Sequence, residues 1–206
     1  MGGGLGTAVY SGDIIRKIDP GQAGLQGTLF GKRNFDNVWS LRVGVSTAKL
    51  MGNDAIQPID RVARDRNWSF NSRVTEFSAV MEFNFLDFAN HKSEFKFSPY
   101  AFFGLGYSFV KGKGERDGIA LEDLKGRGAL VIPFGGGIKY LLSDQLTLGM
   151  ELGFRPTTSD FLDNPDSDQP KDAKIKNFGN PNTKDWYYFL GVTVSYSLNK
   201  ARCYTY

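Results

Sequence analysis

The chain has 206 residues and a formal net charge of +3, is 41% hydrophobic and 14% aromatic, and contains 25 glycines and one cysteine. This length is sufficient for one well-buried domain. Basic residues are spread along the chain, which argues against a nucleic-acid partner, and the lack of any run of 18 apolar residues excludes a transmembrane helix. The single cysteine, Cys203, excludes an internal disulfide and a cysteine-based metal cluster.

The chain opens with MGGGLGTAVY, in which glycine occupies positions 2, 3, 4 and 6. This spacing matches neither the dinucleotide-binding pattern nor the P-loop, and the following RKIDPGQAG indicates a turn where a phosphate site would need a helix. Positions 2, 4 and 6 instead form one face of a strand. We therefore predict a glycine-rich first strand that packs closely against the last one, 186–198, to close a sheet.

Alternation of apolar with polar or small residues continues through most of the chain. It is clearest at 145–154, where Leu146, Leu148 and Met150 share one face, and Thr147 and Gly149 the other. The predicted strands exceed the usual length of about five or six residues. There are eight of them, at 2–10, 22–31, 38–46, 75–85, 96–110, 129–142, 145–154 and 186–198.

Connections between these strands alternate between long and short. Such alternation is typical of an up-and-down outer-membrane barrel with long external loops and short periplasmic turns. We predict an all-β fold, an eight-stranded antiparallel up-and-down transmembrane β-barrel, formed as a single domain by 1–206 and ending in a periplasmic tail at 199–206. The predicted long links are 11–20, 49–66, 111–128 and 156–185, and the short ones are 32–37, 87–95 and 143–145.

A soluble barrel of the lipocalin type shares the same period. Here the wider apolar face suits lipid, whereas the minor face holds glycine, serine, threonine and a few charges that suit a narrow lumen. We therefore expect location in a bacterial outer membrane, surrounded by its lipid, as a mature form, because no signal-peptide pattern follows Met1. Aromatic residues near strand ends are expected to form interfacial girdles: Tyr10, Trp39, Trp68, Phe70, Tyr100, Tyr140, Phe154, Trp186 and Tyr196.

Six charged residues fall on the predicted lumen face. A barrel of eight strands has almost no room for a channel, so its interior is filled by side chains, and buried charges must be paired. We favour a structural ion-pair network over an ion pathway. Its members are Arg42, Glu76, Glu82, Lys139, Glu151 and Arg155.

No pattern supports catalysis or binding of a cofactor or metal. The sole histidine, His91, lies in a predicted periplasmic turn, where it cannot form a Ser–His–Asp arrangement at the outer rim. The acidic segment 159–172 lacks the order of an EF-hand and is read as a solvated loop. We expect no catalytic residues, no cofactor, no metal and no small-molecule substrate.

Cys203 follows the last predicted strand and is therefore placed in the periplasm. An unpaired cysteine in an oxidising compartment suggests an intermolecular disulfide. A terminal cysteine without a role is an equally good interpretation.

Several motifs, in order, resemble the PorG family of the Bacteroidetes type IX secretion system: GGGLGTAVYSGDI, RNWSFNSRVTEFSAVMEFNF, FSPYAFFGLGYSFV, IPFGGGIKYLL, LGMELGFRPTTSDFLDN and the terminal VSYSL and CYTY. The resemblance spans nearly the whole chain and implies a non-enzymatic barrel that anchors the periplasmic ring of the lipoprotein PorK and its partner PorN. It also implies a docking face on the periplasmic side, with Phe88 as an exposed anchor and Cys203 placed to crosslink a ring subunit. The remaining docking residues would be His91, Lys92, Lys200, Arg202 and Tyr204.

The leading hypothesis is thus a scaffold that ties a secretion ring to the membrane. One alternative is a general OmpA/OmpX-like barrel with a structural or adhesive role. A second is a lipid-modifying enzyme of the outer membrane.

Overall fold

The computed structural model describes residues 1–11, 23–53, 68–88, 95–116, 119–120, 124–157 and 186–198. Within these ranges every regular element is a β-strand, and no helix is present that is long and apolar enough to cross a membrane. The strands are β1 (Gly2–Ser11), β2 (Gly24–Asn34), β3 (Trp39–Asn53), β4 (Trp68–Asn84), β5 (Phe97–Arg116), β6 (Ile119–Ala120), β7 (Leu124–Val131), β8 (Phe134–Ser143), β9 (Leu146–Pro156) and β10 (Trp186–Tyr196).

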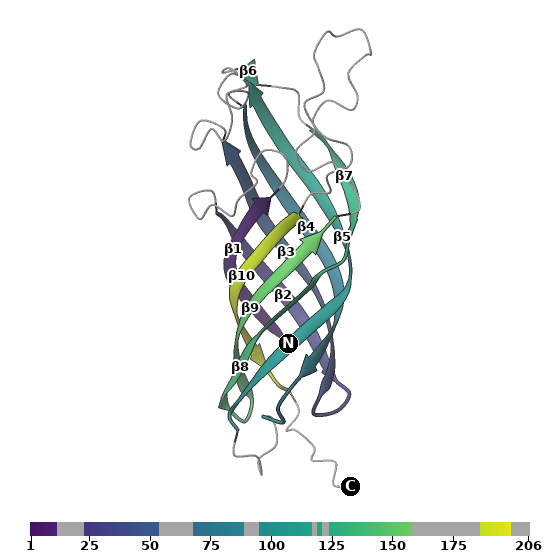
Figure 1. Ribbon diagram of the computed structural model, residues 1–206, viewed down its shortest axis with the longest axis vertical. Coiled ribbons are helices and arrows are strands. Elements are labelled where there is room, and N and C mark those ends of the chain that lie inside the picture. The colour runs from purple at the N-terminus through teal and green to yellow at the C-terminus, as the bar shows by residue number, and fades with distance from the viewer. Residues whose placement is uncertain are drawn as a thin grey trace.

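Neighbouring strands pair antiparallel all the way round a closed ring (Figure 1). β1 pairs with both β2 and β10, the ladder continues from β2 to β5 on one side, and from β10 to β8 on the other. β8 and β7 pair with successive parts of β5, which closes the ring. The predicted eight-stranded antiparallel barrel is therefore confirmed.

The strand predicted at 129–142 is interrupted by Pro133. Phe103 pairs with Phe134 and Gly106 pairs with Val131, so two residues separate the paired positions on both strands and the register is kept. Proline has no N–H to donate to a ladder, although its carbonyl still accepts from Gly104 N at 2.9 Å. β7 and β8 thus form one wall of the barrel.

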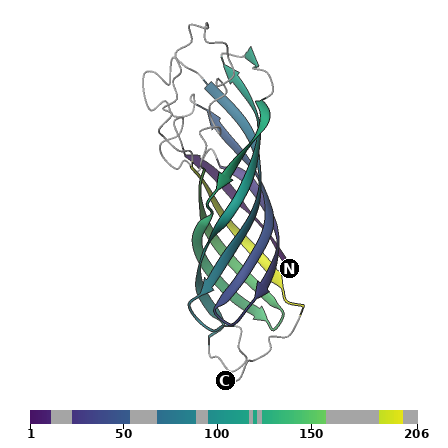
Figure 2. The same cartoon turned by 90° about the vertical axis from the view of Figure 1, so that its right-hand side faces the viewer.

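The largest errors in the predicted strand ends concern three strands. β3 continues seven residues past the predicted end to Asn53, β4 starts at Trp68 rather than 75, and β5 runs to Arg116. The predicted links 49–66 and 111–128 therefore overlap with strand. These additions make β3, β4 and β5 rise above the upper ends of β1, β9 and β10 (Figures 1 and 2).

The barrel has two regions of opposite polarity. In the apolar belt, defined as Trp39–Ser46 of β3, Glu76–Phe83 of β4 and Phe97–Phe109 of β5 with the strands beside them, outward side chains are apolar; Phe77 and Leu105 are 55% and 62% exposed. In the upper extension, defined as Thr47–Asn53, Trp68–Thr75 and Val110–Arg116, the exposed Lys49 alternates with the buried Leu50. Inward and outward positions continue to alternate along the strands. The polarity of the two faces is reversed, because the inward Leu50 and Val74 of the extension are apolar.

The upper part of the interior is filled by one apolar cluster. Leu50 and Val74 from the extension are each 1% exposed and pack with side chains from β1, β7 and β10. The full cluster is Ala8, Ala48, Leu50, Val74, Val110, Val131, Tyr187 and Phe189.

Glycines allow the first and last strands to approach closely, as predicted. A Cβ on Gly4 would lie 2.7 Å from both the Thr193 side chain and the Val192 carbonyl oxygen, and a Cβ on Gly6 would overlap the Leu190 carbonyl oxygen. The register runs from Gly2 opposite Ser195 to Ser11 opposite Trp186. The opening glycines therefore belong to the seam of the barrel.

Candidate functional site

The lower interior contains a network of charged side chains centred on Arg42 and Glu82. Arg42 on β3 contacts Glu82 on the adjacent β4 at 3.0 Å (Nε to Oε1). Its Nη1 also reaches across the barrel to Oε2 of Glu151 on β9, at 2.6 Å. One guanidinium thus joins two carboxylates on opposite walls, the geometry for which its forked donors are suited.

Glu82 is shared by further cations. Lys139 Nζ on β8 donates to Glu82 Oε2 at 2.6 Å and to Asn84 Oδ1 at 2.7 Å. Lys32 Nζ on β2 lies 3.8 Å from the same Glu82 oxygen. Because Glu82 is 1% exposed, its charge is compensated almost entirely by these neighbours.

Aromatic rings surround the network. Tyr100 OH on β5 donates to Glu151 Oε2 at 2.7 Å, and Lys139 Nζ lies 4.1 Å from the centroid of the Tyr100 ring. The Arg42 guanidinium lies 5.1 Å from the ring centroid of Phe102 and 5.4 Å from that of Phe30. Such cation–π contacts compensate in part for the water that the buried cations lose.

A second, smaller group lies higher in the barrel. Arg155 Nε on β9 donates to Glu76 Oε2 on β4 at 3.2 Å, and Tyr187 OH on β10 donates to the same oxygen at 2.7 Å. The Arg155 guanidinium stacks 4.0 Å from the centroid of Phe189. Glu76 Oε1 and Arg155 Nη1 have no hydrogen-bond partner within the described part of the chain.

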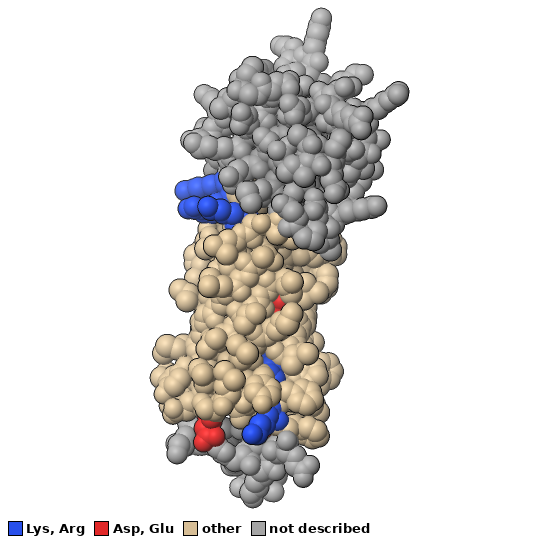
Figure 3. Space-filling model, turned by 90° about the vertical axis from the view of Figure 1, so that its left-hand side faces the viewer, with Lys and Arg blue, Asp and Glu red and all other residues tan. Residues whose placement is uncertain are grey.

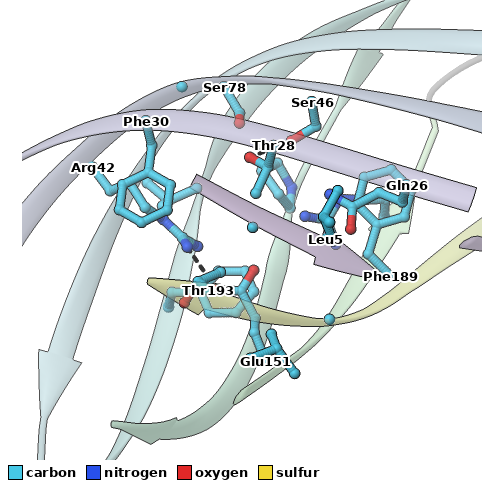
Figure 4. A pocket seen from close by; sticks show the side chains of 18 residues that line it. Leu5, Gln26, Thr28, Phe30, Arg42, Ser46, Ser78, Glu151, Phe189 and Thr193 are labelled. Carbon is cyan, nitrogen blue, oxygen red and sulfur yellow. Dashed lines mark hydrogen bonds and ion pairs between the residues drawn. The ribbon is translucent and has the colours of Figure 1, made fainter. Parts of the chain in front are cut away.

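A cavity of about 30 Å³ lies beside the Arg42–Glu151 pair (Figure 4), and Arg155 of the upper group also contributes to its lining. Its walls include Gln26, Thr28 and Ser46, with Arg42 and Glu151 paired at one side. The volume accommodates one or two water molecules. This cavity is too small for a hydrated ion, and Arg42 pairs across the lumen beside it, as expected for a barrel of eight strands whose interior is filled by side chains.

All six charged residues predicted for the lumen face the interior, and the structure divides them into two groups. Arg42, Glu82, Lys139 and Glu151 form the lower group, and Glu76 with Arg155 forms the upper one. Sequence reasoning did not include four polar partners. Asn84 and Tyr187 lie on the predicted inner face and could have been found by alternation, whereas Lys32 and Tyr100 were assigned elsewhere.

Three assignments need correction. Lys32 was placed in a turn, but β2 continues to Asn34 and directs this side chain inward. Tyr100 was placed in an exposed aromatic girdle, but it is 3% exposed because it occupies an inward position of β5. Phe88 was expected to be an exposed anchor, but it is 6% exposed and therefore offers little surface to a partner.

The other predicted contact residues lie outside the described residues. These are His91, Lys92, Lys200, Arg202, Cys203 and Tyr204, together with the acidic segment 159–172. Within the ranges that the structure describes, no group of three or more His, Cys, Asp or Glu side chains could hold a metal ion.

Fold and interior together define a class: a closed eight-stranded barrel with an apolar outer belt and a charge-paired core. The whole chain, residues 1–206, matches the family described as a domain of unknown function, DUF6089, and therefore belongs to it. None of the curated proteins matches the sequence.

Solved structures with a similar fold include the following three proteins. Neisserial surface protein A shares 11% identity, with a TM-score of 0.48 over 94% of this chain and 92% of that one. Ail, the attachment invasion locus protein of Yersinia pestis, shares 15%, with a TM-score of 0.46 over 95% and 94%. The outer membrane enzyme PagL shares 13%, with a TM-score of 0.39 over 93% and 97%. Similarities this low carry no information about the function of this chain.

Proposed function

We propose that this chain is an integral outer-membrane barrel that acts as a scaffold and not as a pore. The observation behind the proposal is the polarity of the apolar belt, whose outward side chains are apolar while its inward side chains include Arg42 and Glu82. A soluble barrel has the opposite polarity, since its exterior faces water. Hydrocarbon around the belt would remove this apolar surface from water.

The height of the belt agrees with this proposal. Along β4 and the adjoining Phe85, the outward residues are apolar from Phe85 to Phe77, a span of nine residues, and become polar at Thr75, which is paired with Thr47 of β3. A tilted strand crosses a bilayer core in about 9–11 residues. The change at Thr75 and Thr47 therefore falls where such a strand would leave the lipid.

The packed interior supports a scaffold. Arg42, Glu82 and Glu151 pair across the lumen, and the cavity above them has a volume of about 30 Å³. Conduction would require these contacts to separate, at the high energetic cost of unpaired buried charges. What remains available for function is the two ends of the barrel.

For the partner we propose the periplasmic ring implied by the PorG resemblance, a PorK/PorN-like lipoprotein assembly. The docking face would combine His91 and Lys92 with the tail residues Lys200, Arg202 and Tyr204, and Cys203 would crosslink a ring subunit. Phe88 has no place in this face because it is buried. Support for the ring comes from the resemblance of the sequence motifs, and support for the membrane comes from the belt.

Refolding the full chain into lipid vesicles tests the membrane part. We expect insertion, seen as a folded band that migrates differently from the heated protein on a cold SDS gel, and no current in planar bilayers. A protein that stays in solution without detergent would contradict membrane insertion. A steady current from the wild-type chain would contradict a closed scaffold.

Non-reducing gels of cell envelopes test the ring. We expect a crosslinked species containing a lipoprotein in wild type, its loss in Cys203→Ser, and a secretion defect when residues 199–206 are deleted. Normal secretion by the deletion variant would exclude the tail as an anchor. A change in the lipid A mass spectrum on deleting the gene would point instead to a lipid-modifying enzyme.

A further inference from the structure

Three basic residues lie side by side on the outside of the barrel, directly above the apolar belt. Lys49 on β3 is in register with Arg73 on β4, and Arg73 is in register with Lys111 on β5. All three residues are exposed. Figure 3 shows Lys and Arg side chains gathered at the boundary between the tan middle of the molecule and its upper end. We call Lys49, Arg73 and Lys111 the basic row.

This arrangement is unfavourable for the barrel alone. Side chains directly opposite each other on antiparallel strands have Cβ atoms about 4.5–5.5 Å apart, and like charges at this distance destabilise the pair. Among the residues whose side chains the structure describes, no acidic one lies on the outer face beside the basic row; Glu115, four residues beyond Lys111 on β5, lies outside that set. Glu76, Glu82 and Glu151 point inward, and the described aspartates lie in turns at the opposite end.

The opposite rim of the barrel provides a contrast. Its exposed cations Arg33 and Lys96 share that end with Asp36, Asp87 and Asp144. Mixed charges of this kind are typical of a surface exposed to water. The described outer side chains of the basic row are all cations, and an anion from outside would compensate their charge.

The surface below the basic row is aromatic. On the same outer face Phe109 lies two positions below Lys111, and Phe77 lies four positions from Arg73. The Phe77 and Phe109 rings meet edge to face at 6.2 Å, and the Tyr107 and Phe109 rings meet at 5.0 Å. Cations above an apolar surface are complementary to a lipid, whose anionic headgroup would contact the cations and whose hydrocarbon chains would contact the apolar surface.

We propose that the basic row binds the phosphate of a phosphorylated lipid in the leaflet at this end of the barrel, with acyl chains lying along Phe77, Tyr107 and Phe109. Phosphate oxygens would accept hydrogen bonds from Arg73 and the two flanking ammonium groups, which removes the mutual repulsion. The proposal rests on the proposed membrane location, because only there do headgroups lie at the height of the row.

The test uses the full chain in neutral detergent, with native mass spectrometry to measure bound lipid. The probes are diphosphoryl lipid A and phosphatidylcholine as the zwitterionic comparison. The variant Lys49→Gln/Arg73→Gln is matched by Arg33→Gln/Lys96→Gln, which removes the same charge from the opposite rim. Because each basic residue near an anionic lipid contributes about a factor of five, we expect about thirtyfold weaker lipid A binding for the first variant and little change for the second.

A stability measurement separates this proposal from a folding defect. Without lipid A, Lys49→Gln/Arg73→Gln is expected to be at least as stable to urea as wild type, since repulsion is removed. Lipid A should then raise the midpoint of wild type more than that of the variant.

The outcomes that overturn the proposal are distinct from failure of membrane insertion. Wild type that inserts into vesicles but binds lipid A no better than phosphatidylcholine excludes the lipid site while leaving the membrane barrel intact. Equal lipid A binding by the two variants excludes the basic row and favours an acidic protein as its partner. Binding of inorganic phosphate as tight as that of lipid A would show that the acyl chains contribute nothing. A chain that fails to insert into vesicles refutes both proposals.

Discussion

The apolar belt and the upper extension belong to the same strands but have opposite radial polarity. In the belt, Val43 faces outward and Arg42 inward; in the extension, Lys49 faces outward and Leu50 inward. Each arrangement suits a different solvent, because the belt has the pattern of a strand in lipid and the extension that of a strand in water. One continuous strand thus contains the proposed membrane boundary, which the substitutions below test.

Loss of the central cation should have the largest effect. Arg42→Ala leaves Glu151 without its ion pair and weakens the compensation of Glu82, so we expect destabilisation of about 3–5 kcal/mol. Urea titration of refolding into vesicles measures it. Conductance is expected to stay absent, because packed rings and Lys139 still fill the lumen. A clear current from this variant would show that the Arg42–Glu151 ion pair blocks an ion pathway through the barrel.

A new charge on the belt should have the next largest effect. Val43 is 54% exposed on the outer face, and a lysine there would lie in hydrocarbon, at a cost of about 2–4 kcal/mol near the bilayer midplane. The matched control is Thr47→Lys, four residues higher on the same face, for which we expect about 0–1 kcal/mol. The same vesicle titration compares the two, and equal costs would contradict a boundary between them.

Truncation of an apolar side chain should cost more stability in the interior of the extension than on the outer face of the belt. Leu50 is 1% exposed within the apolar cluster of the extension, so Leu50→Ala is expected to destabilise by about 2–3 kcal/mol. Leu105→Ala on the outer belt, where the side chain is 62% exposed, should cost less because lipid fills the space. The urea unfolding midpoints of the two variants test this order. A larger loss of stability for Leu105→Ala would indicate that the belt contacts a protein.

The smallest effect is expected from the upper charge group. Tyr187→Phe removes the hydroxyl that donates to Glu76 at 2.7 Å, while Arg155 remains in place. A hydrogen bond to a charged group contributes about 1.5 kcal/mol or slightly more, and we expect a loss of that size. Tyr107→Phe, on the half-exposed outer face, serves as the control, with a midpoint close to wild type.

Alternation predicted much of the fold and of the charge network. The inner and outer faces of 38–46, 75–85 and 145–154 are as the sequence predicted, so Arg42, Glu82 and Glu151 could be assigned to the lumen before any coordinates. Strand ends were harder to predict. At Leu50 and Val74 the inward residues are apolar. The contrast between a polar inner face and an apolar outer face is therefore lost there, and the predicted strands stop short of these residues.

Pairing between individual charges could not be predicted, because a strand pattern specifies the face and not the height or the neighbour across the lumen. Arg42 and Glu151 are 109 positions apart in the chain and meet only because the barrel is closed. Tyr100 was misassigned for a related reason, since an aromatic near a strand end suits an interfacial girdle as well as the interior.

The sequence by itself determined the number of walls, their antiparallel order and the side on which each residue lies, because the two-residue period of a strand is a local property of the chain. The tertiary structure alone decided which charges pair, which side chains line the cavity, and where three cations become neighbours on the outer face. Those properties depend on register and on closure between β1 and β10, where the opening glycines allow the two backbones to approach.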